Sequence, residues 1–239
     1  MEELNVLAIG AHPDDIELSC MGTLIHHIKL GYNVSILDLS AGELGSRGSA
    51  ELRLIEAQNA ANLVGVKERL NAGLPDGFIQ NDRDSLMKVI TYLRYFKPDW
   101  VFANAFEDRH PDHGKAATLI KEACFLSGLI KIETFWEGVA QKPWRPKSIL
   151  HYAQDFLIKP DLIFDITPYM EEKLAAILCF KSQFYQPGST EPETPISTKH
   201  YMENVRCRTS AYGRYINVQY AEAYEVSRPI GIRELKHLY

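Results

Sequence analysis

Short apolar runs alternate with longer amphipathic segments through the first half of this chain of 239 residues. The runs that predict buried strands are residues 5–10, 33–39, 69–71 and 100–105. The segments that predict helices are residues 16–30, 51–64, 85–96 and 114–126. Strands that alternate with helices of this length need right-handed crossovers, which leave the strands parallel. The alternation therefore predicts an α/β fold with a Rossmann-like, mostly parallel sheet and helices on both faces.

The second half of the chain is less regular, because prolines recur between residues 143 and 195. Its pattern still predicts strands at residues 148–152 and 162–166 and a helix at residues 171–182. The segment 186–198 is rich in Pro, Gly, Ser and Thr, and we expect it to form a mobile loop.

The composition limits the partners and the location that we expect. The chain has 26 Lys and Arg against 31 Asp and Glu, so it lacks the positive excess that binds phosphates, and no nucleic-acid partner is expected. The first residues lack the features of a signal peptide, and no apolar run approaches the ~20 residues that span a bilayer. The cysteines form no C-x-x-C pattern, which favours reduced thiols; they are Cys20, Cys124, Cys179 and Cys207. We therefore expect a soluble cytoplasmic protein with no membrane partner.

The first group of residues able to do chemistry is His12-Pro13-Asp14-Asp15, directly after the first predicted strand. In sheets of this kind, ligands bind outside the carboxyl ends of the strands. A dinucleotide-binding fold would place a glycine-rich turn here to let the backbone approach a pyrophosphate. Two carboxylates repel phosphate and attract a divalent cation, so this turn favours a metal.

A second group, from Glu107 to His113, directly follows the predicted strand 100–105 and contains His110-Pro111-Asp112-His113. An aspartate before a helix is often only an N-cap, and a lone exposed histidine often has no function. Those interpretations suit either group alone, and Asp112 is a plausible cap. They do not explain two His-Pro-Asp motifs at two strand ends, because Asp14 and Asp15 cannot both be caps.

The residue types indicate a class of metal. Two imidazoles and one carboxylate, with a fourth position left for water, are typical of a catalytic zinc site. Iron(II) uses the same donors, so the ligand types leave both Zn²⁺ and Fe²⁺ open. The absence of thiolate ligands favours a catalytic site over a structural one.

The two motifs together resemble the LmbE-like (PIG-L) zinc deacetylases, which remove acetyl groups from N-acetylglucosamine derivatives. The resemblance covers most of the chain, including the glycine-dotted loop 41–49 and the Arg53–Glu56 pair. It is strongest to the bacillithiol-pathway deacetylases, which act on N-acetylglucosaminyl malate. It implies a single domain over residues 1–239, with a Rossmann-like core (1–130) and a C-terminal extension (131–239) that completes the pocket.

The resemblance also implies a role for each residue of the motifs. His12, Asp15 and His113 are expected to bind zinc. Asp14 corresponds to the general base, and His110 to the histidine that stabilises the oxyanion, with Asp112 orienting it. Arg53 and Tyr201 are at positions where the family places residues that contact substrate, and Arg109 could also reach a substrate carboxylate. For Arg53 the alternative is an ordinary surface ion pair with Glu51 or Glu56.

These roles predict hydrolysis of an amide. Zinc lowers the pKa of bound water toward ~7, and Asp14 would take the proton as the water attacks the acetyl carbonyl. Zinc and a protonated His110 would hold the oxyanion. Either Asp14 or His110 would then protonate the leaving amine.

We therefore expect a deacetylase of a small N-acetyl sugar conjugate, acting as a homo-oligomer for which the resemblance allows a hexamer. The alternatives are a deacetylase of diacetylchitobiose or of another N-acetyl sugar, and a metal- or sugar-binding protein without catalysis. We expect the pocket walls to come from the loops 41–49, 128–146 and 186–201, whose aromatic residues can line a sugar site or pack against the core.

Overall fold

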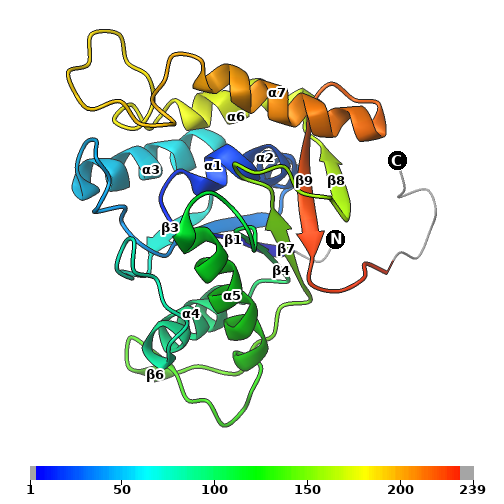
Figure 1. Ribbon diagram of the computed structural model, residues 1–239. Helices are drawn as coiled ribbons and strands as arrows, with labels where there is room; N and C mark the ends of the chain where they lie inside the picture. The colour runs from blue at the N-terminus through cyan, green and yellow to red at the C-terminus, as the bar shows by residue number, and fades with distance from the viewer. Residues whose placement is uncertain (1–3, 232–239) are drawn as a thin grey trace.

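The computed structural model describes residues 4–231, which form a seven-stranded sheet of order β3-β2-β1-β4-β7-β9-β8 (Figure 1). The parallel strands are β1 (Asn5–Gly10), β2 (Asn33–Asp38), β3 (Glu68–Asn71), β4 (Trp100–Ala103) and β7 (Ser148–Tyr152). At the other edge, β9 (Ala221–Val226) pairs antiparallel with β7 and with β8 (Leu162–Asp165). A separate hairpin joins β5 (Phe135–Trp136) to β6 (Val139–Ala140). The predicted, mostly parallel α/β sheet is confirmed.

Helices cover both faces of the sheet (Figure 1). The helices on one face are α4 (Arg83–Phe96) and α5 (Pro111–Leu126). Those on the other are α1 (Asp15–Ser19), α2 (Met21–Lys29), α3 (Ala50–Val64), α6 (Met170–Ile177) and α7 (Tyr201–Gly213). Side chains of β1 alternate between two cores: Leu7 and Ile9 pack with α4 and α5, and Val6 and Ala8 pack with α1 and α2. Such alternation is what a strand buried on both faces requires.

The predicted helix of residues 16–30 is broken at Cys20 into α1 and α2. The carboxylate of Glu222 in β9 explains the break, because it accepts hydrogen bonds from the N–H groups of Gly22 (2.9 Å) and Thr23 (2.8 Å). A negative charge at the start of a helix also opposes the helix dipole favourably. The partner lies 200 residues further along the chain, so the local pattern did not reveal it.

The C-terminal half departs most from the prediction. The helix expected at residues 171–182 ends at Ile177, and both α7 and β9 were missed, as were the short 3₁₀ helices η1 (Thr167–Tyr169) and η2 (Arg214–Ile216). The buried face of α7 mixes Val205 with Thr209 and Tyr212, so its apolar period is weak. The first four residues of β9 are buried, Glu222 among them, which hides the strand pattern.

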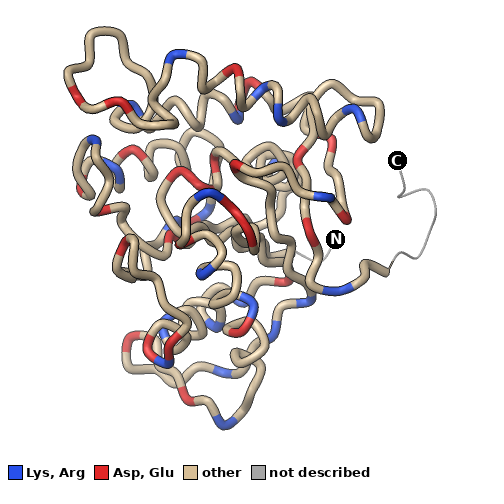
Figure 2. The backbone as a smooth tube through the Cα atoms, in the orientation of Figure 1, with Lys and Arg blue, Asp and Glu red and all other residues tan. Residues whose placement is uncertain are grey.

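Charge and hydropathy agree with a globular domain. Basic and acidic positions are interspersed over the described backbone (Figure 2). Within residues 4–231, no helix combines the length and the apolar character needed to cross a bilayer. The four cysteines are free thiols, two of them buried.

Candidate functional site

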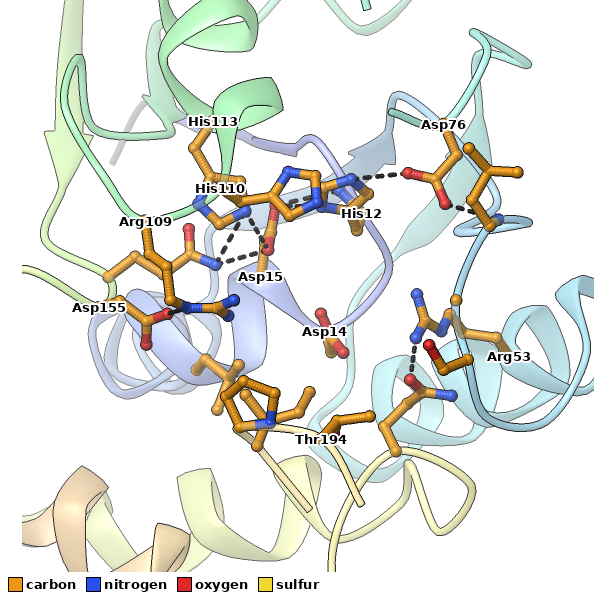
Figure 3. Close-up of a pocket in the computed structure, with 18 of the residues that line it drawn as sticks. His12, Asp14, Asp15, Arg53, Asp76, Arg109, His110, His113, Asp155 and Thr194 are labelled. Atoms are coloured by element: carbon orange, nitrogen blue, oxygen red, sulfur yellow. Dashed lines mark hydrogen bonds and ion pairs between the residues drawn. The ribbon is translucent and has the colours of Figure 1, made fainter. Parts of the chain in front are cut away.

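The two His-Pro-Asp motifs meet at the carboxyl ends of β1 and β4. These strands are neighbours in the sheet although β2 and β3 lie between them in the chain, so the strand order reverses at this point. A doubly wound sheet forms its ligand crevice at such a reversal. A cavity of about 340 Å³ opens there, lined by residues of both motifs (Figure 3).

Three imidazole rings and one carboxylate gather at the base of this cavity. The ring centroid of His12 lies 4.6 Å from that of His110 and 5.5 Å from that of His113. The carboxylate of Asp15 lies between two of these rings, with Oδ2 3.7 Å from Nδ1 of His12 and Oδ1 3.3 Å from Nε2 of His113. All three expected metal ligands are buried. The structure thus brings together His12, Asp15 and His113 from motifs about a hundred residues apart.

Each expected ligand has an outer partner. Asp15 accepts hydrogen bonds from the side-chain amides of Asn104 (2.9 Å) and Gln154 (2.6 Å). Nδ1 of His113 lies 2.6 Å from a carboxylate oxygen of Asp108. Partners of this kind orient metal ligands and tune their basicity. No role was predicted for Asn104, Gln154 or Asp108, although Asn104 directly follows β4 and Asp108 lies in the group Glu107 to His113.

The Nε2 atom of His12 faces one carboxylate of the second motif and one from outside both motifs. Nε2 lies 3.0 Å from Asp76, which follows β3, and 3.5 Å from Asp112, but neither contact has the geometry of a hydrogen bond. Burial alone would lower the pKa of His12, but the carboxylates of Asp112, Asp15 and Asp76 raise it well above the usual range. Burial also opposes protonation of His113, whose pKa the carboxylates of Asp15 and Asp108 raise to about 9.

This distribution of charge fits a cation. Asp14, Asp15, Asp76 and Asp112 are all buried around His12, and the pocket wall adds the guanidinium of Arg53. Nε2 of His12 and Oδ1 of Asp112 are buried polar atoms without hydrogen-bond partners. A divalent ion would balance the carboxylates and leave the imidazoles as neutral donors, which is the state that binds metals. The donor set of two nitrogens and a carboxylate suits Zn²⁺.

Asp14 occupies a special backbone conformation. Its φ of 111° lies in a region that side-chain-bearing residues rarely adopt, directly before α1. It lines the cavity apart from the imidazole cluster (Figure 3). Burial raises the pKa of Asp14 to about 7; the charge of Asp15 adds to this shift, and the charges of Arg53 and His12 oppose it. A carboxylate that titrates near neutral pH suits a general base.

His110 caps the N-terminus of α5. Its Nδ1 accepts a hydrogen bond from the backbone N–H of Asp112 at 3.3 Å, so the proton of the neutral ring sits on Nε2. Burial and the positive charges of His12 and His113 lower the pKa of His110. The protonated His110 of the predicted reaction stays a prediction, and burial favours the neutral ring. A neutral ring still offers Nε2–H as a donor.

Asp112 contacts His110 through its backbone and directs its carboxylate elsewhere. Asp112 orients His110 through its backbone N–H, whereas its carboxylate accepts from the backbone N–H of Gly77 at 2.7 Å. The reason is that α5 begins at Pro111, three residues earlier than predicted, and turns the carboxylate of Asp112 toward His12.

All three residues expected to contact substrate line the cavity: Arg53, Arg109 and Tyr201. Arg53 is buried and donates to the side-chain oxygen of Gln183, so the surface-pair alternative is wrong. Glu56 instead accepts from the backbone N–H and hydroxyl of Ser182.

The other two cavity residues have local partners as well. Nε of Arg109 lies 2.5 Å from a carboxylate oxygen of Asp155. Tyr201 begins α7, is buried, and stacks on Phe184 with 5.8 Å between ring centroids. Asp155 was not predicted; it follows β7 by three positions, at the same sheet edge as the motifs.

Two of the three predicted loops form the cavity walls. Leu44 to Ser46 of the loop 41–49 and Thr194 to Ile196 of the loop 186–201 line it. Arg47 joins the two loops by donating to the carbonyl of Pro192 at 2.8 Å. The prediction that residues 128–146 line the cavity was wrong. This segment packs beside α4, where Trp136 stacks on Tyr95 with 4.1 Å between the ring centroids.

Known proteins resemble this chain over most of its length. The family of GlcNAc-PI de-N-acetylases, PIG-L, matches residues 7–124. Diacetylchitobiose deacetylase of Thermococcus kodakarensis is 30% identical over 75% of this chain and 70% of its own length. A solved structure of a conserved protein from Thermus thermophilus is 32% identical, with a TM-score of 0.84 over 96% of this chain and 97% of that one. 4-Oxalmesaconate hydratase of Pseudomonas putida is 26% identical over 75% of this chain and 74% of its own length.

Proposed function

This chain belongs to the PIG-L family of de-N-acetylases, and we propose that it is a zinc-dependent deacetylase of an N-acetylglucosamine conjugate. The family and the enzyme class predicted from the two His-Pro-Asp motifs are confirmed. The observation that carries the proposal is the convergence of His12, Asp15 and His113 near the buried carboxylate of Asp14. Metal donors beside a general base are what amide hydrolysis at a metal requires.

N-acetylglucosaminyl malate is the substrate that we propose, which would assign the chain to bacillithiol biosynthesis. A cavity of about 340 Å³ suits a small sugar conjugate, and the cationic side chains of Arg53 and Arg109 in its lining support an anionic aglycone. Diacetylchitobiose is an equally supported alternative, because the relative from Thermococcus is named for that substrate. We further propose a cytoplasmic homo-oligomer, with a hexamer as one expected state, which sedimentation velocity tests.

The metal ion would be held by His12, Asp15 and His113. When bound, zinc supplies Lewis-acid chemistry that polarises the acetyl carbonyl and makes water acidic enough to ionise near neutral pH. Asp14 accepts the proton of the attacking water, which its pKa of about 7 permits, and then returns a proton to the leaving amine. Nε2–H of His110 donates to the oxyanion, and a donor of this kind contributes about 2.7–4 kcal/mol in comparable sites.

A second function is favoured by the hydratase relative. Addition of water to the double bond of a small polycarboxylate needs an activated water and a proton-transfer residue, which this site also offers. The two functions differ in product: one releases acetate, and the other removes a conjugated double bond.

Acetate release therefore tests the proposal. The panel comprises N-acetylglucosaminyl malate, diacetylchitobiose, free N-acetylglucosamine, an inositol conjugate and 4-oxalmesaconate, with the protein loaded with Zn²⁺ or Fe²⁺. We expect acetate from the malate conjugate at the highest kcat/KM, and loss of acetate release with retained metal in Asp14→Asn. Hydration of 4-oxalmesaconate without acetate from any amide would replace the proposed function by the second one.

A further inference from the structure

We propose that Asp108 is a positioning residue that fixes the metal ligand His113 and one pocket wall with the same carboxylate. Oδ2 of Asp108 lies 2.6 Å from Nδ1 of His113. Oδ1 accepts hydrogen bonds from the backbone N–H groups of Asp155 (3.1 Å) and Phe156 (3.0 Å). The side chain of Asp108 is 1% exposed, so water does not compete for these contacts. The inference rests on the proposed metal site.

The first consequence concerns the ring of His113. A carboxylate on one side of the ring keeps the proton on Nδ1 and leaves the lone pair on Nε2. Nε2 is the atom that faces Asp15, at 3.3 Å from Oδ1. Asp108 therefore selects both the orientation and the tautomer in which His113 can bind a metal together with Asp15.

The second consequence concerns the segment that follows β7. Asp108 holds the backbone of Asp155 and Phe156, and the preceding residue, Gln154, donates to Asp15 at 2.6 Å. Asp155 pairs with Arg109 in the lining of the cavity. The carboxylate of Asp108 therefore connects His113 to the segment after β7. Through Gln154, that segment also holds Asp15, another proposed metal ligand.

Zinc affinity of the metal-free protein tests this role, measured by competition with a chromophoric chelator. Asp108→Asn keeps the size of the side chain and one acceptor oxygen for the backbone, but places an amide where the carboxylate met Nδ1–H. We expect zinc binding to weaken by roughly 10–100-fold, as for other outer partners of metal-bound histidines. Asp165→Asn is the matched control, because Asp165 also accepts from a backbone N–H, that of Thr167 at 2.8 Å, and does not line the cavity.

An affinity of Asp108→Asn equal to that of the wild type and of Asp165→Asn would overturn the inference and leave the proposed function intact. Failure of the wild-type protein to bind zinc would overturn both. Long-range proton–nitrogen NMR spectra of the zinc-loaded wild type give a test that needs no variant to fold. They are expected to show His113 protonated at Nδ1 and metal-bound through Nε2, and coordination through Nδ1 would contradict the role of Asp108.

Discussion

The parallel and antiparallel halves of the sheet build different parts of one cavity. The loops after the parallel strands β1, β3 and β4 supply the three imidazoles together with Asp14, Asp15 and Asp76. The segment between α6 and α7 supplies Gln183 and the stretch Thr194 to Ile196, and α7 supplies Tyr201. The first set can bind a cation and move protons, whereas the second is uncharged at neutral pH and shapes the walls. The proposed chemistry thus belongs to the parallel half, whereas both halves contribute to the walls of the pocket.

The two halves also bury their charges differently. In the parallel half, the guanidinium of Arg69 donates two hydrogen bonds to the carboxylate of Asp38 (2.7 and 2.9 Å) and one to that of Glu17 (2.6 Å). In the C-terminal half, Lys173 pairs with Glu222 at 2.6 Å. Arg69 is the cation that Asp38 and Glu17 share, whereas Glu222 accepts hydrogen bonds from several donors besides Lys173.

The largest expected effect falls on the parallel half. His113→Ala removes a proposed metal ligand, so zinc affinity is expected to fall by more than the ~10²-fold that loss of an outer partner can cost. Asp14→Asn is expected to keep zinc and lower kcat by about 10²–10⁴-fold. Metal analysis and acetate release measure the two quantities on the same samples. Retained zinc in His113→Ala would show that the motif after β4 is not part of the metal site.

Arg69→Met should destabilise the fold more than Lys173→Met. The first variant leaves two buried carboxylates without their cation, which costs about 3–5 kcal/mol. The second leaves Glu222 with donors from Gly22, Thr23 and Tyr224, so we expect about 1–3 kcal/mol. Urea unfolding of the metal-free protein measures both free energies.

Arg206→Met serves as the control for this pair, because the ion pair of Arg206 with Glu171 is exposed to solvent and contributes little to the free energy of unfolding. Equal losses of unfolding free energy in Arg69→Met and Lys173→Met would show that the two halves depend equally on their buried cations.

Acid should weaken the fold through His151 of β7. Burial lowers the pKa of this ring to about 4, and its neutral form bonds the Asn104 carbonyl (2.8 Å) and the Ser227 hydroxyl (3.1 Å). The unfolded chain binds the proton near pH 6.5, so the contribution is complete above that value and is lost as the pH falls toward 4. The expected loss reaches about 3 kcal/mol.

His151→Asn removes the titrating ring and is the comparison for this measurement. The difference in unfolding free energy between wild type and His151→Asn is expected to shrink from pH 7 to pH 4. A constant difference would mean that His151 keeps an ordinary pKa in the fold.

The smallest expected effect falls on the wall of the cavity. Tyr201→Phe removes one hydroxyl from the lining, so KM is expected to rise by up to about 10-fold, with kcat and zinc content unchanged. Tyr215→Phe, an exposed tyrosine of η2, is the control. Loss of zinc in Tyr201→Phe would contradict the division of roles between the two halves.

The sequence predicted the parallel half well because its signals are local. The strands and helices of residues 5–126 follow from apolar period and glycine stops, and both motifs directly follow strands, where the topology brings them together. Asp76 escaped notice because one acidic residue in a loop has no distinguishing pattern, and Asp108 belonged to the second group but its partner His113 could not be read from the sequence. The roles of Gln154 and Asp155 depend on contacts with Asp15, Asp108 and Arg109 across the sheet edge.

By itself, the sequence determined the class of fold, the family, and the pairing of His12, Asp14 and Asp15 with His110 and His113. The tertiary structure decided which groups surround them: Asp76 and Asp112 beside His12, Asp108 beside His113, and Asn104 with Gln154 on Asp15. It also decided that Asp112 orients His110 through the backbone and that residues 128–146 lie away from the cavity. The physical reason is that local periodicity encodes strands and helices, whereas pKa values and ligand orientation depend on burial and on partners distant in the chain.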